Sequence, residues 1–319
     1  MSLLPYRHPG RAFLSRYGML RREEDVFRYV DFLRQESGLS DEPPIALTPI
    51  YQHFGIPEPL RAPLDEQQGI LVDSNSGIIL IKEDDPIVRQ RFTEGHELME
   101  LLFDAQLEAQ EALGSLLPTW SEPHKERLCD RGAAELLMPQ SSFVPRLSQA
   151  GISFRTGRSL AKRYQTSLVA TLMRMLQYGR GNFALVMWHS ALKPSEVKHP
   201  IADAEPQKKL RVCWKVQTQD WTGGFIPKDK SISPDSLIFQ AYLKGQPQHG
   251  TEMIHLGWGS IPCEVEAMPL RMGDRSDVLS LLRFQDDRAN QDDGTNRGDR
   301  AKTKRFPVAP RPIRRSVSR

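Results

Sequence analysis

The sequence has few cysteines, and none of them has a paired spacing. Among 319 residues there are only three, at Cys129, Cys213 and Cys263. An odd, scattered set argues against the disulfide framework of small secreted domains and favours a reducing compartment.

Long hydrophobic runs are also missing. The longest are short, such as Ile78–Ile81 and Phe183–Trp188, whereas a membrane-spanning helix needs about 20 apolar residues. Residues 1–22 contain five arginines among scattered apolar residues, without the continuous apolar stretch of a secretory signal. We therefore expect a cytoplasmic protein with no membrane segment.

A strong net charge is absent as well, since the whole chain is only +3. Residues 297–319 carry nine basic residues and one acid, so this tail is +8 and the rest of the chain is −5. A mildly acidic body is not typical of a dedicated nucleic-acid binder. Residues 286–319 lose the apolar periodicity of the preceding chain, which predicts a disordered basic tail.

The remaining composition, 39% hydrophobic and 26% charged, is that of a soluble globular protein of two or three domains. We expect an irregular N-terminus over residues 1–20 and a first domain over 21–145. Apolar spacing and turn residues predict the secondary structure of that domain. The expected elements are helices over 23–36 and 45–54, a β-hairpin over 69–81, a helix from Asp84 to about Phe103, and a helix over 123–138.

The second half of the chain has a different pattern of expected secondary structure. Residues 146–180 read as a helical segment, in which two short helices over 154–178 resemble a helix-turn-helix. From residue 181 to about 285, short β-leaning stretches alternate with Gly and Pro, and these include 183–188, 210–216, 236–243 and 264–270. The fold class expected is α+β, with a helical first domain and a β-rich C-terminal domain.

The chemistry of the sequence concentrates in His96-Glu97-Leu-Met-Glu100. Residues four apart lie on one face of a helix, so His96 and Glu100 can bind one ion together, with Glu97 at the edge of that face. The zinc peptidases called zincins have this spacing, but with histidine at the last position. A surface helix with solvated carboxylates is the alternative, because the short motif alone arises by chance.

A second segment, Glu126 to Pro139, follows about 26 residues after Glu100. The small residues Gly132, Ala133 and Ala134 would let this helix pack closely against the first. That packing would bring Glu126 toward His96 and Glu100 as a third ligand.

Together the two segments resemble the ImmA/IrrE metallopeptidases. That family has Arg-x-Phe-Thr-x-x-His-Glu-Leu-x-His, followed by Glu-x-x-Ala-(Asn/Asp)-x-Phe-Ala-x-x-Leu-Leu-Met-Pro. This chain has Phe92-Thr93, His96-Glu97-Leu98, Glu126, Asp130 and Ala133 through Pro139 at the matching positions. The resemblance covers roughly residues 23–180.

The resemblance implies that His96 and Glu126 bind a metal, with Glu100 where the second histidine is expected. Glu97 would be the general base that takes a proton from water. Zinc is the metal expected, with manganese as the alternative. The implied activity is that of an intracellular protease that cleaves a helix-turn-helix repressor, often under stress, and so switches genes on.

The departure at Glu100 changes the charge of the site. A divalent ion with two neutral histidines and one carboxylate leaves a site of +1, whereas His96 with two carboxylates leaves it neutral. A more anionic set of ligands makes the ion a poorer Lewis acid and shifts preference toward harder ions such as Mn²⁺. The site is therefore an active variant, a weak metal site or an inactive binding fold, and restoring histidine at position 100 should strengthen zinc binding.

Other readings remain open at this stage. His124 and Asp130 are additional candidate ligands, although His124 in its polar stretch reads first as a surface residue and Cys129 reads as core. A regulatory protein that docks its repressor without cutting it is the rival hypothesis. A DNA-binding role for residues 158–176, with Arg158, Lys162, Arg163 and Arg174, is the third.

Overall fold

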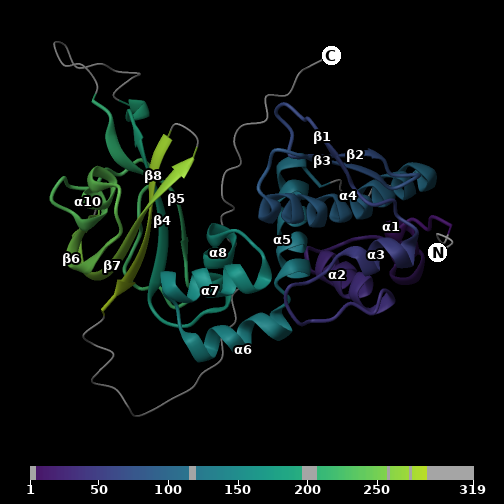
Figure 1. The fold of residues 1–319 in the computed structure, drawn as a ribbon, viewed down its shortest axis with the longest axis horizontal. Coiled ribbons are helices and arrows are strands. Elements are labelled where there is room, and N and C mark those ends of the chain that lie inside the picture. The colour runs from purple at the N-terminus through teal and green to yellow at the C-terminus, as the bar shows by residue number, and fades with distance from the viewer. Residues whose placement is uncertain (1–4, 115–119, 196–206, 257–258, 273–274, 286–319) are drawn as a thin grey trace. The chain divides into compact units, whose positions relative to one another are not determined.

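The computed structural model describes residues 5–114, 120–195, 207–256, 259–272 and 275–285. Within them, helices and two β-sheets give the α+β architecture predicted from the sequence (Figure 1). The chain divides into two compact units, and the described parts of the first are residues 5–114, 120–150 and Arg158–Thr171. None of the helices in these ranges is long and apolar enough to cross a membrane. The predicted disordered tail, 286–319, lies outside the described residues.

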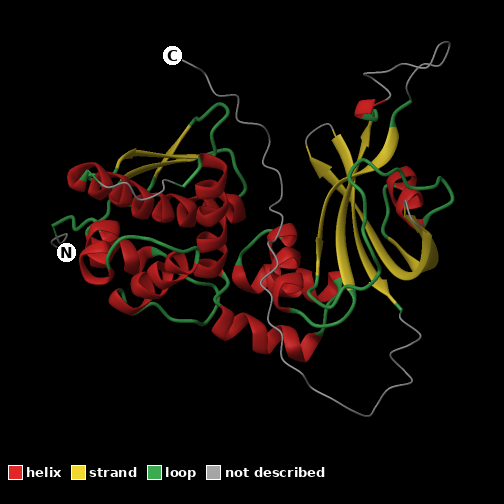
Figure 2. Ribbon diagram, turned by 180° about the vertical axis from the view of Figure 1, so that it is seen from behind, coloured by secondary structure: helices red, strands yellow, loops and turns green. Residues whose placement is uncertain are grey.

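Helix α4, Ile87–Leu113, runs through the middle of the first unit. One side of α4 packs against a small sheet and the other against N-terminal helices (Figures 1 and 2). Those helices are α1 (Pro9–Tyr17), α2 (Glu24–Glu36) and α3 (Thr48–Phe54). Helix α5, Glu122–Leu137, packs along α4, and α6, Gln140–Ala150, follows it.

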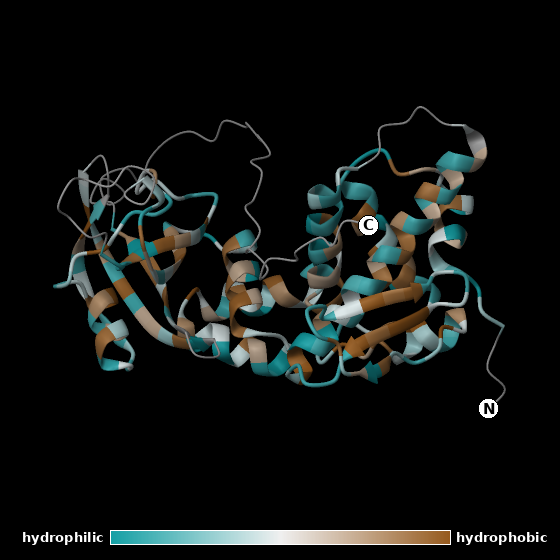
Figure 3. Ribbon diagram, turned by 90° about the horizontal axis from the view of Figure 1, so that it is seen from above, coloured by the Kyte–Doolittle hydropathy of each residue, from teal (hydrophilic) through white to brown (hydrophobic). Residues whose placement is uncertain are grey.

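The small sheet has the strand order β1-β3-β2. Strands β2 (Gly69–Asp73) and β3 (Ile78–Lys82) are antiparallel, which confirms the predicted hairpin. Strand β1 (Leu60–Ala62) is parallel to β3 and too short for its pattern to be recognised in the sequence. Strand β2 therefore lies at an edge of the sheet, and its strongly apolar sequence is visible in Figure 3.

The expectation of an irregular N-terminus is wrong for Pro9–Tyr17, which form α1. Proline is well placed in a first helical turn. His8 caps the helix, because its Nδ1 accepts a hydrogen bond from the Arg11 backbone N–H. Histidine is not among the usual capping residues, so the sequence signal was weak. Burial of Phe13, 1% exposed, anchors the helix in the core.

Helix α4 also extends ten residues beyond the predicted end at Phe103. The added turns are polar, which concealed their burial. Gln106 is 3% exposed, and its side-chain carbonyl accepts a hydrogen bond from the Leu20 backbone N–H at 2.8 Å. Packing against α1 and the chain that follows it thus overrides the local polarity of the sequence.

The second unit consists of Gly151–Gly157 and the chain from Leu172 onward, of which the last described residue is 285. It contains an antiparallel sheet of order β5-β4-β8-β7-β6. Its strands are β4 (Phe183–Ala191), β5 (Lys209–Gln217), β6 (Gln248–Leu256), β7 (Gly259–Met272) and β8 (Arg275–Phe284). Buried Trp188 on β4 donates a hydrogen bond to Ser280 on β8 at 2.7 Å. The predicted strands near 183, 210 and 264 are confirmed.

The predicted strand over 236–243 is wrong, because Leu237–Lys244 form helix α10. Ser236 caps this helix by accepting a hydrogen bond from the Ile238 backbone N–H, and Gly245 ends it in the left-handed conformation. Ile238 and Ala241 are buried at helical spacing. The two short helices expected over 154–178 are confirmed as α7 (Phe154–Tyr164) and α8 (Leu168–Tyr178).

Candidate metal centre

Helices α4 and α5 approach each other closely through small residues. A Cβ atom added to Gly95 would lie 3.3 Å from the Cβ of Ala133, and one added to Gly132 would lie 2.5 Å from the Met99 sulfur. A larger side chain at these points would separate the helices. The close approach places the polar faces of the two helices against each other, as the small residues of the sequence predicted.

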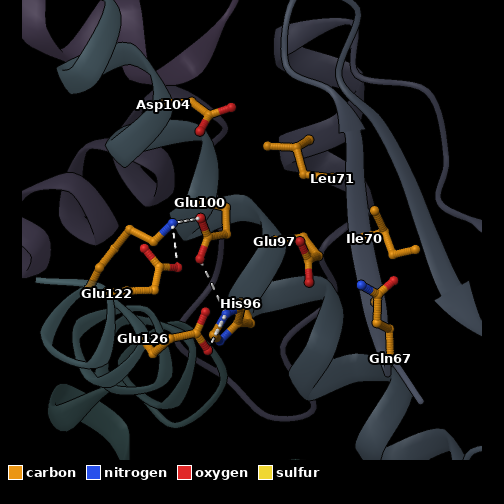
Figure 4. Close-up of a pocket in the computed structure, with 11 residues that line it drawn as sticks. Gln67, Ile70, Leu71, His96, Glu97, Glu100, Asp104, Glu122 and Glu126 are labelled. Atoms are coloured by element: carbon orange, nitrogen blue, oxygen red, sulfur yellow. Dashed lines mark ion pairs between the residues drawn. The ribbon is translucent and has the colours of Figure 1, made fainter. Parts of the chain in front are cut away.

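His96 of α4 is the centre of the polar cluster and is 1% exposed. Its Nδ1 lies 3.0 Å from Oδ1 of Asp130 on α5. On the other side of the ring, Nε2 lies 3.5 Å from Glu100 Oε1 and 3.8 Å from Glu126 Oε2. Figure 4 shows these two carboxylates converging on the ring edge. The structure therefore brings together all three residues that the sequence analysis proposed as ligands.

The distances from His96 Nε2 to the two carboxylates suit a divalent metal ion, although the donor atoms that all lie within 4.8 Å of one another are those of His96, Glu100 and Cys129. A carboxylate accepts hydrogen bonds, so Asp130 holds the ring with the proton on Nδ1 and leaves Nε2 facing two carboxylate oxygens. A proton on Nε2 or a cation between these atoms would satisfy that arrangement. Two donors about 2.1 Å from a tetrahedral zinc ion are about 3.4 Å apart, close to the 3.5 and 3.8 Å found here.

Glu97 lies beside this cluster, on the side of α4 that faces strand β2 (Figure 4). It is only 4% exposed. A Cβ atom added to Gly69 at the start of β2 would lie 2.9 Å from Glu97 Oε1 and 2.3 Å from the Thr93 methyl group. Glycine at position 69 therefore makes the room that the Glu97 carboxylate occupies.

These groups line a pocket of about 200 Å³ between α4, α5 and β2. Helix α4 contributes His96, Glu97, Glu100 and Asp104, α5 contributes Glu122, Lys125 and Glu126, and the chain around β2 contributes Gln67 and Gly69–Leu71. Carboxylates dominate two walls, while β2 supplies backbone and apolar side chains. The pocket is thus anionic on its α4 and α5 sides and is bounded by a strand edge on its β2 side.

Lys125 is a pocket residue that the sequence analysis missed. Its ammonium lies 2.9 Å from Glu100 Oε2 and 3.1 Å from Glu122 Oε1. Burial lowers the pKa of Lys125, but the two carboxylates raise it by a larger amount. The net pKa lies above the usual value, so the group stays charged. A sequence signal existed, because Glu122, Lys125, Glu126 and Cys129 share one face of α5 at helical spacing.

Glu100 is held at both oxygens. Burial raises the pKa of its carboxyl group, but His96 and Lys125 lower it more, to about 2. The Cys129 thiol donates a hydrogen bond to Oε1 at 3.5 Å. Glu100 is therefore an anion, fixed in place before any ligand binds.

Cys129 lies in the core, as expected, and is fully buried. Its Sγ nevertheless lies within 4.8 Å of the donor atoms of His96 and Glu100. Burial and the charge of Glu100 raise the pKa of the thiol. In this arrangement Cys129 is a hydrogen-bond donor to Glu100, and its place behind that carboxylate was not apparent from the sequence.

The additional candidates have separate positions. Asp130 contacts the Nδ1 side of His96, away from the edge that faces the other carboxylates. His124 does not line the pocket. Its Nε2 lies 2.9 Å from Glu23 Oε1, and its ring packs edge-on against Trp120.

Comparison with known proteins adds a family to this geometry. Residues 60–176 match the family model described as the IrrE N-terminal-like domain, a peptidase family. This segment is similar to IrrE N-terminal-like domains. The match includes β1 to β3, α4, α5 and the whole pocket, so it confirms the resemblance seen in the two sequence motifs.

The matched segment covers only part of the chain, and a search of curated proteins finds no match. Among solved structures, a transcriptional regulator from Mycobacterium tuberculosis is similar in fold over 87% of this chain and 80% of that one. The TM-score is 0.51 and the sequence identity is 12%. At this identity the likeness is one of architecture.

Proposed function

We propose that the chain is a divalent-metal-dependent endopeptidase, with His96, Glu100 and Glu126 as the metal ligands. The proposal rests on one observation. The ring of His96, oriented by Asp130, presents Nε2 to two carboxylate oxygens at the separation of tetrahedral donors. The peptidase family matched by residues 60–176 supports the same conclusion.

A cation bound there would supply the Lewis acidity that polarises a scissile carbonyl and makes water more acidic. Zinc is the metal we propose, because the donors number three and include an imidazole. Glu97 would act as the general base, since its carboxylate lines the same pocket and is 4% exposed. Gly69 keeps space for that carboxylate beside β2.

Strand β2 supports a peptide as the substrate. It pairs with β3 on one side, and its residues Gly69–Leu71 line the pocket. An extended peptide can add to such an edge through backbone hydrogen bonds, which would place a peptide bond next to Glu97. Exposed Val72, at 53%, would extend the apolar surface of this strand.

The substrate we propose is a helix-turn-helix transcriptional repressor in the bacterial cytoplasm, whose cleavage switches on stress or mobile-element genes. The family resemblance and the regulatory title of the Mycobacterium tuberculosis neighbour support this setting. A direct DNA-binding role for α7 and α8 has less support. Of its basic residues, Arg174 is 3% exposed and stacks on Tyr178, whereas Arg158, Lys162 and Arg163 are exposed.

One observation favours a second candidate function, a regulatory protein that binds its repressor without cutting it. Both oxygens of Glu100 have protein partners, Lys125 and Cys129, so this residue is satisfied by the chain itself. If those contacts exclude a metal ion, the pocket and the β2 edge would still bind a peptide.

Incubation of the purified full chain with a candidate repressor, in wild-type and Glu97→Gln forms, separates the two functions. The peptidase proposal predicts cleavage by the wild type, abolished in Glu97→Gln although the variant keeps its metal. Glu111→Gln, on the exposed end of the same helix, is the matched control and should cleave normally. Repressor binding with no cleavage by metal-loaded wild type would support the second function.

A further inference from the structure

We infer that Lys125 is a positioning residue that, together with Glu100, replaces the neutral second histidine of the family motif. This inference rests on the proposed metal site and concerns how that site works with an anionic ligand. Its basis is the ion pair between Lys125 Nζ and Glu100 Oε2 at 2.9 Å inside the pocket.

The first consequence concerns charge. Counted over His96, Glu100 and Glu126 alone, a site with a divalent ion is neutral. The Lys125 ammonium contacts Glu100 directly, so the pair contributes no net charge, as a neutral histidine would. Lys125 also contacts Glu122, but that side chain is 70% exposed, so solvent screens its charge. Counted over the ion, His96, Glu126 and the Glu100–Lys125 pair, the site returns to +1, the value that two histidines and one carboxylate give. Because Lys125 is 22% exposed and Glu100 13%, solvent screens this charge only in part.

The second consequence concerns geometry. Lys125 forms an ion pair with Oε2 of Glu100, while Oε1 of Glu100 lies 3.5 Å from His96 Nε2. Only one oxygen of Glu100 therefore faces the other ligands. A single oxygen donor suits the low coordination number of zinc, whereas Mn²⁺ favours more oxygen donors. Lys125 thus opposes the shift toward manganese that the ligand change alone would cause.

The third consequence reverses an expectation drawn from the sequence. Histidine at position 100 would leave the Lys125 charge beside the cation with only the solvent-exposed Glu122 carboxylate to balance it, so this change alone should weaken metal binding. Removing the Lys125 charge at the same time should restore it. The two residues therefore act together. Glu100→His should lower the metal affinity, and removal of the Lys125 charge should raise it.

Four forms of the full chain test this inference: wild type, Glu100→His, Lys125→Met and the double variant. Affinities for Zn²⁺ and Mn²⁺ are measured by competition with a chromophoric chelator. We expect Glu100→His to bind Zn²⁺ about tenfold or more weakly than wild type, and Lys125→Met to bind Mn²⁺ about tenfold or more tightly. The double variant should return to within about threefold of wild type for Zn²⁺.

Lys125→Arg keeps the charge and should stay near the wild-type affinity, which guards against a folding defect in the methionine variant. Lys162→Met, at an exposed position on α7, controls for the change in total charge. Wild-type affinity for both ions in Lys125→Met, or tighter Zn²⁺ binding in Glu100→His, would overturn the inference. His96→Ala separates the failures, because metal binding that is the same in wild type and His96→Ala would refute the metal site itself.

Discussion

The Nδ1 atom of His96 and the Oδ1 atom of Asp130 lie 3.0 Å apart, across the interface of two helices. This contact fixes the ring so that Nε2 faces the carboxylates of Glu100 and Glu126. A partner of this kind raises the basicity of a ligating histidine and sets its orientation. Asp130, which entered as a candidate ligand, is placed to orient a ligand.

Asp130→Asn tests that role. The amide can still accept a hydrogen bond but no longer carries the charge that supports the ring, so zinc affinity should fall by about 10- to 100-fold. The zinc affinity is measured by competition with a chelator. Asp235→Asn, at an exposed position, should bind zinc as the wild type does. Unchanged affinity in Asp130→Asn would remove Asp130 from the site.

Gly69→Ala tests the space beside Glu97. The added methyl group would lie 2.3 Å from the Thr93 methyl and 2.9 Å from Glu97 Oε1, so one of these neighbours must move. We expect a loss of about 1–3 kcal/mol in the free energy of unfolding and a large drop in peptidase activity with metal retained. Gly259→Ala, where no atom lies within 4 Å of the new Cβ, is the control. Full activity in Gly69→Ala would show that Glu97 does not depend on this space.

Ala133→Leu tests the helix crossing. Because Ala133 lies against Gly95, the larger side chain should push α5 from α4 and carry Glu126 away from His96. Unfolding by denaturant should show a loss of about 1–3 kcal/mol, accompanied by lost metal binding. Ala134→Leu, at a partly exposed position on the same helix, should be milder in both measurements. A stable Ala133→Leu with normal metal affinity would contradict the close packing.

His8 gives the first unit a pH dependence independent of the metal site. Burial and the Arg11 guanidinium lower the pKa of His8 to about 4, while Glu108 opposes them. Since the folded state holds the neutral ring, the stabilisation is complete above pH 6.5 and is lost as the pH falls toward 4. Denaturant unfolding at pH 7 and pH 4.5 should differ by about 2 kcal/mol more in wild type than in His8→Asn. Equal pH dependence in the two proteins would exclude this role.

The sequence predicted the features that depend on periodic or paired signals. His96 and Glu126 are 30 positions apart, yet the motif and the small residues Gly132 and Ala133 predicted their approach. Lys125 was missed because its spacing on α5 shows only that it shares a face with Glu122 and Glu126, whereas its role depends on contact with Glu100 on the other helix. Helix α1 was missed because its cap is a histidine, and α10 because its apolar residues also suit a strand.

The most direct test of the account is the zinc content of the wild type and of Glu126→Gln, each loaded with excess zinc and then freed of unbound ion. Glu126 is the ligand contributed by the second helix, and its Oε2 lies 3.8 Å from His96 Nε2. We predict one tightly held zinc ion per wild-type chain. In Glu126→Gln the zinc affinity should fall by about tenfold or more. A wild type without zinc, or a variant that holds it as tightly, would contradict the assignment of a metal site to these helices.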